Sequence, residues 1–245
     1  MVPSPLAVFG AAMAAICAVI FLVSARYAWR ASALLRADAV TTLAGADSGS
    51  LVRVEGTVER DADPLVAPFS GAECVALREQ VEERRLSVPT VLPWYVTLSE
   101  TTGGVSFAVN TGRDTVGVTS PTHTVALETR VVATVAPGTD PPERIARFER
   151  ETEPVPTTTF WQDPPWLLAG LFDALSLGVR RYTEQRADLG DAVTVVGRVT
   201  DEGVDSLVLS DRSPTRTLVR MAGVSLAGLG VGVLAVPIVR FAVLG

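Results

Sequence analysis

Two long apolar runs without a charged residue constrain this chain more than any other feature. They cover residues 6–24 and 221–239, 19 residues each. A helix rises 1.5 Å per residue, so about 20 apolar residues cross the hydrocarbon core of a bilayer. We therefore expect transmembrane helices at residues 6–25 and 221–244, with the lipid bilayer as the first partner. The domain they enclose would cover residues 37–211.

Arginines mark the inner ends of both runs. Three follow the first run and three precede the second, namely Arg26, Arg30, Arg36, Arg212, Arg216 and Arg220. Positive charge beside a span favours the cytoplasmic side, so the pattern predicts a cell-membrane protein with two spans and a cytoplasmic central domain. A cleavable signal peptide is the alternative for the first run. It requires positive charge ahead of the apolar stretch, and residues 1–5 carry none.

The spans themselves contain small residues at helix-packing distance. Gly228 and Gly232 form a G-x-x-x-G pair, and Ala11 and Ala15 have the same spacing in the first run. Small residues four positions apart let helices approach closely. Gly228 and Gly232 therefore predict either packing between the two anchors or a homo-oligomer, although such spacing also arises by chance in Ala/Gly-rich helices.

The charge of the central segment excludes several classes of function. Residues 37–211 hold 14 arginines against 27 acidic residues, a net charge of −13, and the chain has no lysine. Such a domain is a poor ligand for nucleic-acid phosphates, so we expect no nucleic-acid partner. Excess carboxylate with arginine in place of lysine suits high intracellular salt, which favours a salt-loving archaeal source. Two cysteines exclude a disulfide framework and a multi-cysteine zinc module.

Alternating apolar and polar residues predict an α+β, mainly β fold: a compact barrel- or sandwich-like domain with one or two helices. The glycines at positions 56 and 197 fall inside expected strands, where glycine marks a bulge or a bend. Hairpins are expected over residues 95–109, around a TTGG turn, and at Glu202-Gly203. The expected strands are residues 51–59, 74–83, 94–99, 105–110, 125–136, 193–200 and 207–210, and the expected helices are residues 141–150 and 166–187.

Residues 166–179 are apolar but too short for a confident span. One interpretation is a helix packed on the sheet. The other is a helix at the membrane surface, with Trp166, Leu167, Leu171 and Phe172 entering the headgroup region. A helix at the membrane surface normally has basic residues flanking its polar face, and only Arg180 and Arg181 provide them, so the packed helix is favoured.

Few residues can carry catalysis. Cys74 and His123 are the one available nucleophile–base pair, but Cys74 falls in a strand pattern and His123 in a polar turn, where both have ordinary structural roles. The acidic clusters at positions 55–63 and 149–153 are interpreted as solvated surface. We predict no catalytic residue, cofactor or metal site.

One loop differs from generic solvated loops because it concentrates proline, phenylalanine and glycine. We predict a ligand or protein-partner loop formed by Pro64, Pro68, Phe69, Ser70, Gly71 and Arg78. The alternative is a rigid connection between two strands.

Three stretches of the central segment resemble a known family. They are VEGTVE at residues 54–59, PLVAPFSGAECVALREQVEE at residues 64–83 and RRYTEQRADLGDAVTVVGRV at residues 180–199. Together they are similar to the membrane-adjacent β-rich domain of GIDE/MULAN-type E3 ubiquitin ligases, over residues 51–204. The most specific pieces are residues 68–71 with Cys74, and residues 181–184 leading to Gly190-Asp191 and residues 195–197.

The resemblance implies a domain between two transmembrane helices, followed in that family by a RING finger. A RING binds two zinc ions through eight Cys/His ligands, more than the two cysteines and one histidine of this sequence. We therefore expect a membrane-anchored, non-enzymatic interaction or sensing module with a protein partner at the membrane. The alternative is a component or relative of a RING-type E3 ubiquitin, or ubiquitin-like, transferase whose catalytic RING lies elsewhere.

Overall fold

A computed structural model of the chain describes residues 36–87, 92–119, 124–152, 156 and 158–211, together with the single positions 18, 19, 22 and 25. Two compact units are distinguished, one of Ala39–Asp211 and one of Met1–Asp38 with Arg212–Gly245. Apart from those single positions, the predicted spans at residues 6–25 and 221–244 lie outside the described residues, and so do Gly228 and Gly232. Across the described ranges, no helix has the length and apolar character needed to cross a membrane.

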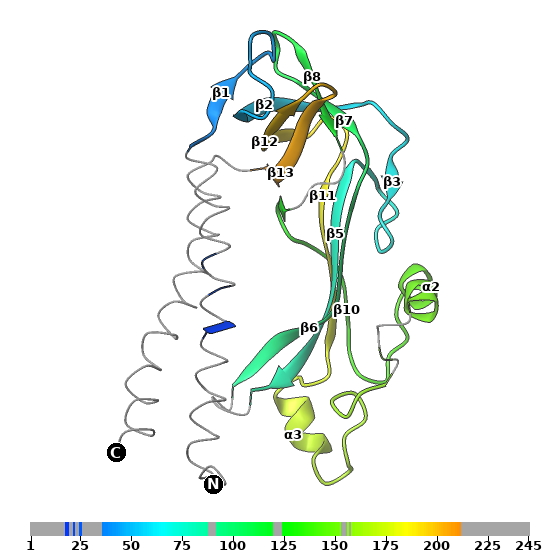
Figure 1. Cartoon of the computed structure of the whole chain (residues 1–245). Helices are drawn as coiled ribbons and strands as arrows, with labels where there is room; N and C mark the ends of the chain where they lie inside the picture. The colour runs from blue at the N-terminus through cyan, green and yellow to red at the C-terminus, as the bar shows by residue number, and fades with distance from the viewer. Residues whose placement is uncertain are drawn as a thin grey trace, which may run out of the picture. The chain divides into compact units, whose positions relative to one another are not determined.

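The unit of Ala39–Asp211 is mainly β, as the alternating sequence predicts (Figure 1). Its two described helices are α2 (Glu143–Glu151) and α3 (Ala169–Ala174). The strands are β1 (Asp38–Val40), β2 (Leu51–Arg60), β3 (Leu65–Val66), β4 (Glu73–Cys74), β5 (Ala76–Leu86), β6 (Pro93–Gly104), β7 (Phe107–Asn110), β8 (Thr115–Thr119), β9 (Val125–Ala126), β10 (Arg130–Val135), β11 (Arg180–Ala187), β12 (Ala192–Thr200) and β13 (Gly203–Ser210).

Five of the strands close into a barrel. β2 pairs antiparallel with β12 along most of its length and with β7 at its last four residues. β7 pairs antiparallel with β8, and β12 with β13. β8 and β13 complete the circle with a short parallel contact at Val118↔Val204. The order β2–β7–β8–β13–β12, with this one parallel pair, is that of the OB-fold, a five-stranded Greek-key barrel.

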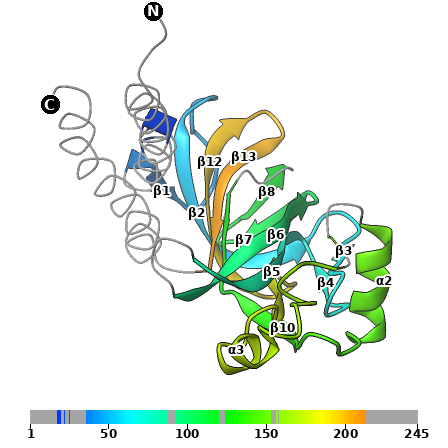
Figure 2. The ribbon, with the colours of Figure 1, turned by 90° about the horizontal axis from the view of Figure 1, so that it is seen from below.

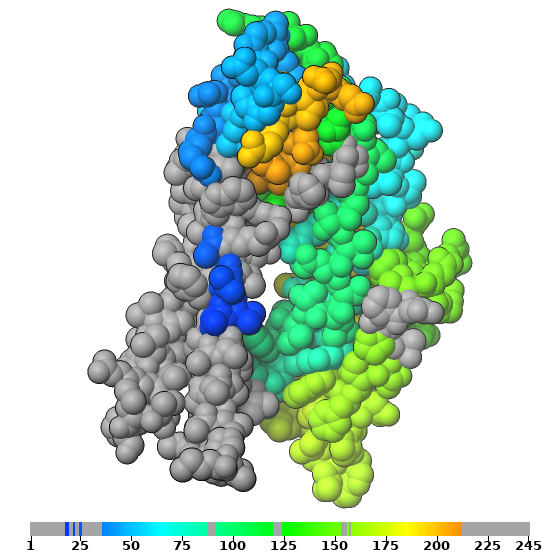
Figure 3. Space-filling view, viewed as in Figure 1, coloured from blue at the N-terminus to red at the C-terminus, as the bar shows by residue number. Residues whose placement is uncertain are grey.

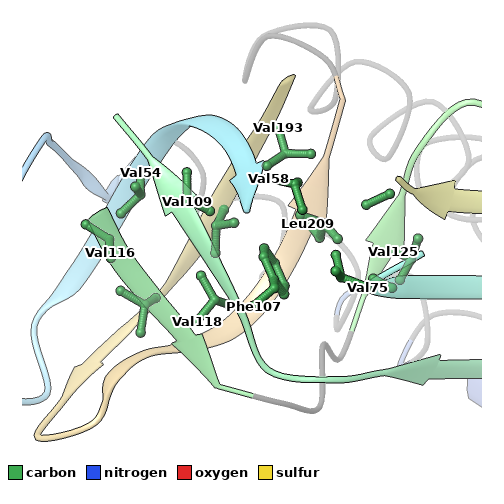
Figure 4. Packing of buried hydrophobic residues seen from close by; sticks show 14 of the residues in the cluster. Val54, Val58, Val75, Phe107, Val109, Val116, Val118, Val125, Val193 and Leu209 are labelled. Carbon is green, nitrogen blue, oxygen red and sulfur yellow. The ribbon is translucent and has the colours of Figure 1, made fainter. Parts of the chain in front are cut away.

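Valine dominates the barrel interior because a β-branched side chain fits a pleated surface well and has few rotamers to lose. Alternation along β2 sends Val52, Val54 and Val58 inward. They meet Phe107 of β7 and the inward residues of the other barrel strands (Figure 4). The cluster consists of Val52, Val54, Val58, Val75, Ala76, Phe107, Val109, Val116, Val118, Val125, Leu127, Ala187, Val193, Val195, Val199, Val204 and Leu209.

The two glycines inside barrel strands lie where the sheet curls. A Cβ on Gly56 would come within 2.2 Å of the carbonyl oxygen of Asn110, at the part of β2 where its pairing passes from β12 to β7. A Cβ on Gly197 would lie 2.2 Å from the carbonyl oxygen of Asp205, beside a register shift between β12 and β13. Both positions match the expected bend or bulge.

Two insertions into the barrel build a second, four-stranded antiparallel sheet of order β10–β11–β5–β6. β5 and β6 come from the connection between β2 and β7, while β10 and β11 come from the connection between β8 and β12. The central pair is β5 with β11, in register from Glu83↔Arg180 to Ala76↔Ala187. Figures 1 and 2 show this sheet beside the barrel, with α2 next to the small β3–β4 hairpin.

Two expectations about elements are wrong. The predicted hairpin over residues 95–109 does not form: β6 continues through its glycines, pairs with β5 as far as Ala76↔Gly104, and β7 joins β2 and β8 instead. The predicted helix over residues 166–187 is replaced by α3 and β11. Ser176 and Gly178 have positive φ angles of 52° and 76°, which end the helix. The helix expected at residues 141–150 is present as α2, and the hairpin at Glu202-Gly203 joins β12 to β13.

Candidate functional site

The predicted partner loop is the connection of the β3–β4 hairpin, in which Leu65 pairs with Cys74. The N–H of Ala67 donates to the carbonyl of Ala72, and the N–H of Gly71 donates to the carbonyl of Ala67, both at 2.8 Å. Gly71 has a φ of +76°, in the region that favours glycine. A side chain there would also meet the guanidinium of Arg144, since a Cβ would lie 2.8 Å from its Cζ. The turn is therefore tightly closed.

A buried carboxylate from β11 fills this turn. Oε1 of Glu184 accepts hydrogen bonds from the N–H groups of Phe69 at 2.9 Å and Ser70 at 3.0 Å. Oε2 accepts from the Ser70 hydroxyl at 2.6 Å. Two successive N–H groups that converge on one oxygen form an anion-binding nest. Glu184 thus occupies, from inside the chain, the position in which an external anion would bind.

Arg186 balances the charge of Glu184, which is fully buried. Its Nη1 lies 3.2 Å from Oε2 of Glu184 and donates to the Ser70 hydroxyl oxygen at 2.6 Å. Its Nε donates to Asp188 at 2.9 Å. Breaking such a buried pair leaves a charge uncompensated, so these contacts hold the loop in one position.

Phe69 anchors the same loop through apolar contacts. Its ring lies edge-to-face with Phe148 of α2, at 4.9 Å between centroids, and with Tyr182 of β11, at 5.5 Å. Val81, Val135 and Ile145 are the other buried residues of the cluster. Edge-to-face pairs at these separations are favourable beyond the area they bury. Phe69 therefore connects the hairpin, α2 and the sheet.

The structure brings five of the six predicted loop residues together, and Arg78 is the exception. Pro64 and Pro68 are half-buried, Phe69 is buried, and Ser70 is exposed to solvent. Arg78 lies three positions before Val81 in β5, so strand alternation puts it on the opposite face from the Phe69 cluster. Its guanidinium pairs with Glu100 at 2.9 Å.

Cys74 is not a nucleophile in this structure. It is fully buried beside Ala67 and Leu77, and burial, together with the charges of Asp188 and Glu184, raises the pKa of its thiol to about 11. Reaction requires the thiolate, which is scarce at neutral pH with such a pKa. His123, its predicted partner, lies outside the described residues.

Glu79 lies opposite Glu184 in the register of β5 and β11. Burial is the main cause that raises the pKa of Glu79 to about 7, and repulsion by Glu184 adds to it, while a hydrogen bond with Thr101 acts in the opposite direction. Two carboxylates in adjacent strands disfavour joint ionisation. Glu79 is therefore partly protonated at neutral pH.

A second buried ionic cluster lies farther along the same sheet, around Arg180. This guanidinium contacts Glu83 at 3.4 Å and Glu149 of α2 at 2.8 Å, and it also donates to the carbonyl of Pro156. The hydroxyl of Tyr182 donates to Glu149 at 2.5 Å. Burial, and then this contact with Glu149, raise the pKa of the Tyr182 phenol. The cluster fastens α2 to the sheet.

The Arg180 cluster forms one wall of a cavity of about 430 Å³. Its other walls include the turn after β10 and the acidic side chains of Asp140 and Asp163. Arg180 is the one basic residue among the described lining residues, and both of its carboxylate partners belong to the protein. The cavity therefore offers an external anion no uncompensated positive charge.

The acidic clusters divide between surface and interior. Glu55, Glu59, Asp61 and Asp63 are exposed, as expected, whereas the side chain of Glu149 is only 14% exposed within the Arg180 cluster. Over the described ranges, no group of three or more His, Cys, Asp and Glu residues is arranged to hold a metal ion.

Sequence reasoning missed the residues that hold the loop, Glu184 and Arg186, and it missed Arg144, whose guanidinium lies beside Gly71. One signal was available. The family resemblance rests on residues 68–71 and on residues 181–184, and the structure joins these two pieces through the carboxylate of Glu184.

Comparison of the chain with protein-family models, curated proteins and solved structures finds no match.

Proposed function

We propose that this chain is a membrane-anchored, non-enzymatic interaction or sensing module. Its anchors are helices at residues 6–25 and 221–244, and residues 37–211 form a cytoplasmic domain that binds a protein partner at the cell membrane. The two charge-free runs and the arginines at their inner ends support the anchoring and the orientation.

The single observation that carries the proposal is that the two reactive groups beside the loop, the Glu184 carboxylate and the Cys74 thiol, maintain its structure. Both carboxylate oxygens of Glu184 accept hydrogen bonds from the Phe69–Ser70 turn. The thiol of Cys74 is buried and has a pKa of about 11. A group that is fixed by buried partners and held in its unreactive form serves positioning better than chemistry. The loop is thereby presented as a fixed surface.

The outer side of the hairpin supplies contact area for a partner. Val66 is 59% exposed, and Ser70 and Glu73 are exposed beside it. A preorganised loop loses little conformational entropy on binding, which favours recognition.

Crosslinking of the full chain in native membranes, followed by purification and mass spectrometry, tests the proposal. A specific partner should be lost in Val66→Asp and retained in Val131→Asp, a matched change at a 52%-exposed valine on β10. Equal recovery of every crosslinked protein by both variants and the parent chain would contradict a partner site at the loop.

The family resemblance favours the alternative function, a component of a RING-type E3 ubiquitin or ubiquitin-like transferase. In that case the catalytic RING belongs to another polypeptide, because this sequence holds too few zinc ligands. The same purification distinguishes the two functions. A zinc-RING protein or a ubiquitin-like conjugating enzyme would support the transferase, whereas transporters, secretion factors or lipids alone would support the sensing module.

A further inference from the structure

Five large apolar side chains are exposed around α3. The exposed fraction is 83% for Trp166, 73% for Leu167, 54% for Phe160, 52% for Leu171 and 38% for Leu168. Single exposed apolar residues are ordinary on protein surfaces, but contiguous groups mark sites of interaction. We name these five residues the apolar tip.

The apolar tip is supported from behind. Phe172 is the buried residue of α3, and its ring stacks on Trp161 with centroids 5.5 Å apart. The chain after α3 is hydrogen-bonded to β5, since the N–H of Gly178 donates to the carbonyl of Arg84, and the N–H of Arg84 donates to the carbonyl of Val179. Of the two interpretations of residues 166–179, the membrane-surface alternative is wrong for Phe172, because its ring is buried and serves as the internal anchor.

A second exposed apolar group lies at the same end of the four-stranded sheet. Trp94 is 59% and Leu92 is 64% exposed. Trp94 pairs with Arg85, next to the residue that bonds the segment after α3. Figures 1 and 2 show the first residues of β6 close to α3. Exposed apolar side chains therefore occur on both elements at this end of the sheet.

The charge around the apolar tip indicates its partner. Residues 164–172 contain no charged side chain, and the flanking charges, Asp163 and Asp173, are acidic. The nearest arginines in sequence are already paired, Arg180 with Glu83 and Glu149 and Arg181 with Glu82. The apolar tip and its flanking residues in the chain therefore provide no positive charge that would attract an acidic protein or anionic lipid headgroups. Tryptophan and leucine on a protruding surface suit the boundary between headgroups and acyl chains.

We propose that the apolar tip inserts into the interfacial layer of the lipid bilayer. Figure 3 shows the α3 region as a protruding part of the unit of Ala39–Asp211, a shape that fits a fluid bilayer. The inference rests on the proposed anchoring, since two spans in the same chain would keep the domain near lipid at high effective concentration. Insertion then needs no basic residues and is insensitive to salt.

The test uses the full chain in nanodiscs of zwitterionic lipid, with one copy per disc and with Cys17 and Cys74 replaced by alanine. A nitroxide is attached in turn at Leu167→Cys, at Ala15→Cys in the first apolar run, and at Glu202→Cys in the exposed β12–β13 turn. Relaxation by oxygen, which concentrates in lipid, is compared with relaxation by a water-soluble nickel chelate.

Insertion predicts that the label at 167 collides several-fold more with oxygen and several-fold less with nickel than the label at 202. It also predicts that Leu171→Asp reverses this at 167. A label at 167 as open to nickel as the label at 202 would overturn the inference, as would shielding from both reagents, which indicates a protein contact. Because the label at 15 reports the anchor separately, a lipid signal there with an aqueous signal at 167 rejects the apolar tip and leaves the anchoring intact.

Discussion

The barrel and the four-stranded sheet bury different kinds of side chain. Of the described residues, the charged side chains that are buried are Glu83, Arg180 and Glu184, and all three belong to the sheet. The barrel buries apolar side chains, with a few hydroxyls. Apolar burial is non-directional, whereas a buried charge requires specific partners. The barrel therefore supplies stability, and the sheet fixes the positions of the loop and α2.

Removal of the guanidinium of Arg180 should have the largest effect on stability. Arg180→Met strips two carboxylates, Glu83 and Glu149, of a partner. Loss of one member of a buried pair typically costs about 3–5 kcal/mol, so denaturant unfolding should show a decrease of this size in the free energy of unfolding. Hydrogen exchange should accelerate in α2 before it does in β2. Equal acceleration in both would mean that barrel and sheet unfold as one.

A change in the barrel should act through shape alone. In Gly56→Ala the new methyl would meet the carbonyl oxygen of Asn110 at 2.2 Å, a backbone contact that must move. We expect a loss of about 2–3 kcal/mol, as for overpacked cores. The loss should be the same at low and high salt, because the substitution removes no charged group. A strong salt dependence would contradict the assignment of this site to packing.

The pH dependence of the sheet should be smaller and opposite to that of an ordinary ion pair. The pKa of Glu79 is raised to about 7, so ionisation destabilises the folded state, and stability present below the unfolded pKa is lost as the pH rises toward 7. Glu79→Gln removes this loss. Thermal melts should show the variant more stable by about 1–2 kcal/mol above pH 8, after allowance for partial exposure, and equal to the parent chain near pH 4. A variant without advantage at pH 8 would contradict the raised pKa.

The smallest effect is expected at Arg78. Its ion pair with Glu100 is partly exposed and lies on the face opposite to the Phe69 cluster. Arg78→Gln should lower stability by about 0.5 kcal/mol or less. Hydrogen exchange at Phe69 and Ser70 should not change. Faster exchange there would place Arg78 in the support of the loop after all.

Most strands could be predicted from the sequence because their signals are local. Alternation over β2 and β12 and the glycines at positions 56 and 197 reflect contacts with adjacent strands. The TTGG stretch at residues 101–104 wrongly predicted a hairpin turn, because its residues stay in β6 and pair with β5. Pairing partners depend on the whole topology, which a local turn signal does not contain.

The support of the predicted loop was only partly predictable. Proline and glycine at positions 68 and 71 indicated a constrained turn, which exists. The side chain that constrains it, Glu184, lies 114 positions from Ser70, and no spacing rule links the two. Arg78 was assigned to the loop by proximity in sequence, whereas strand alternation turns it to the other face.

By itself, the sequence determined that residues 39–211 fold mainly as β-structure, because apolar alternation and glycine bends act between neighbouring residues. It also supplied the acidic surface and the lysine-free composition. Only the tertiary structure decided that Glu184 fills the Phe69–Ser70 turn and that Cys74 is held as a buried thiol. It also decided that Phe172 of α3 is buried while Trp166, which precedes the helix, is exposed. These outcomes depend on burial and on charges from distant strands, which come together only when the sheet forms.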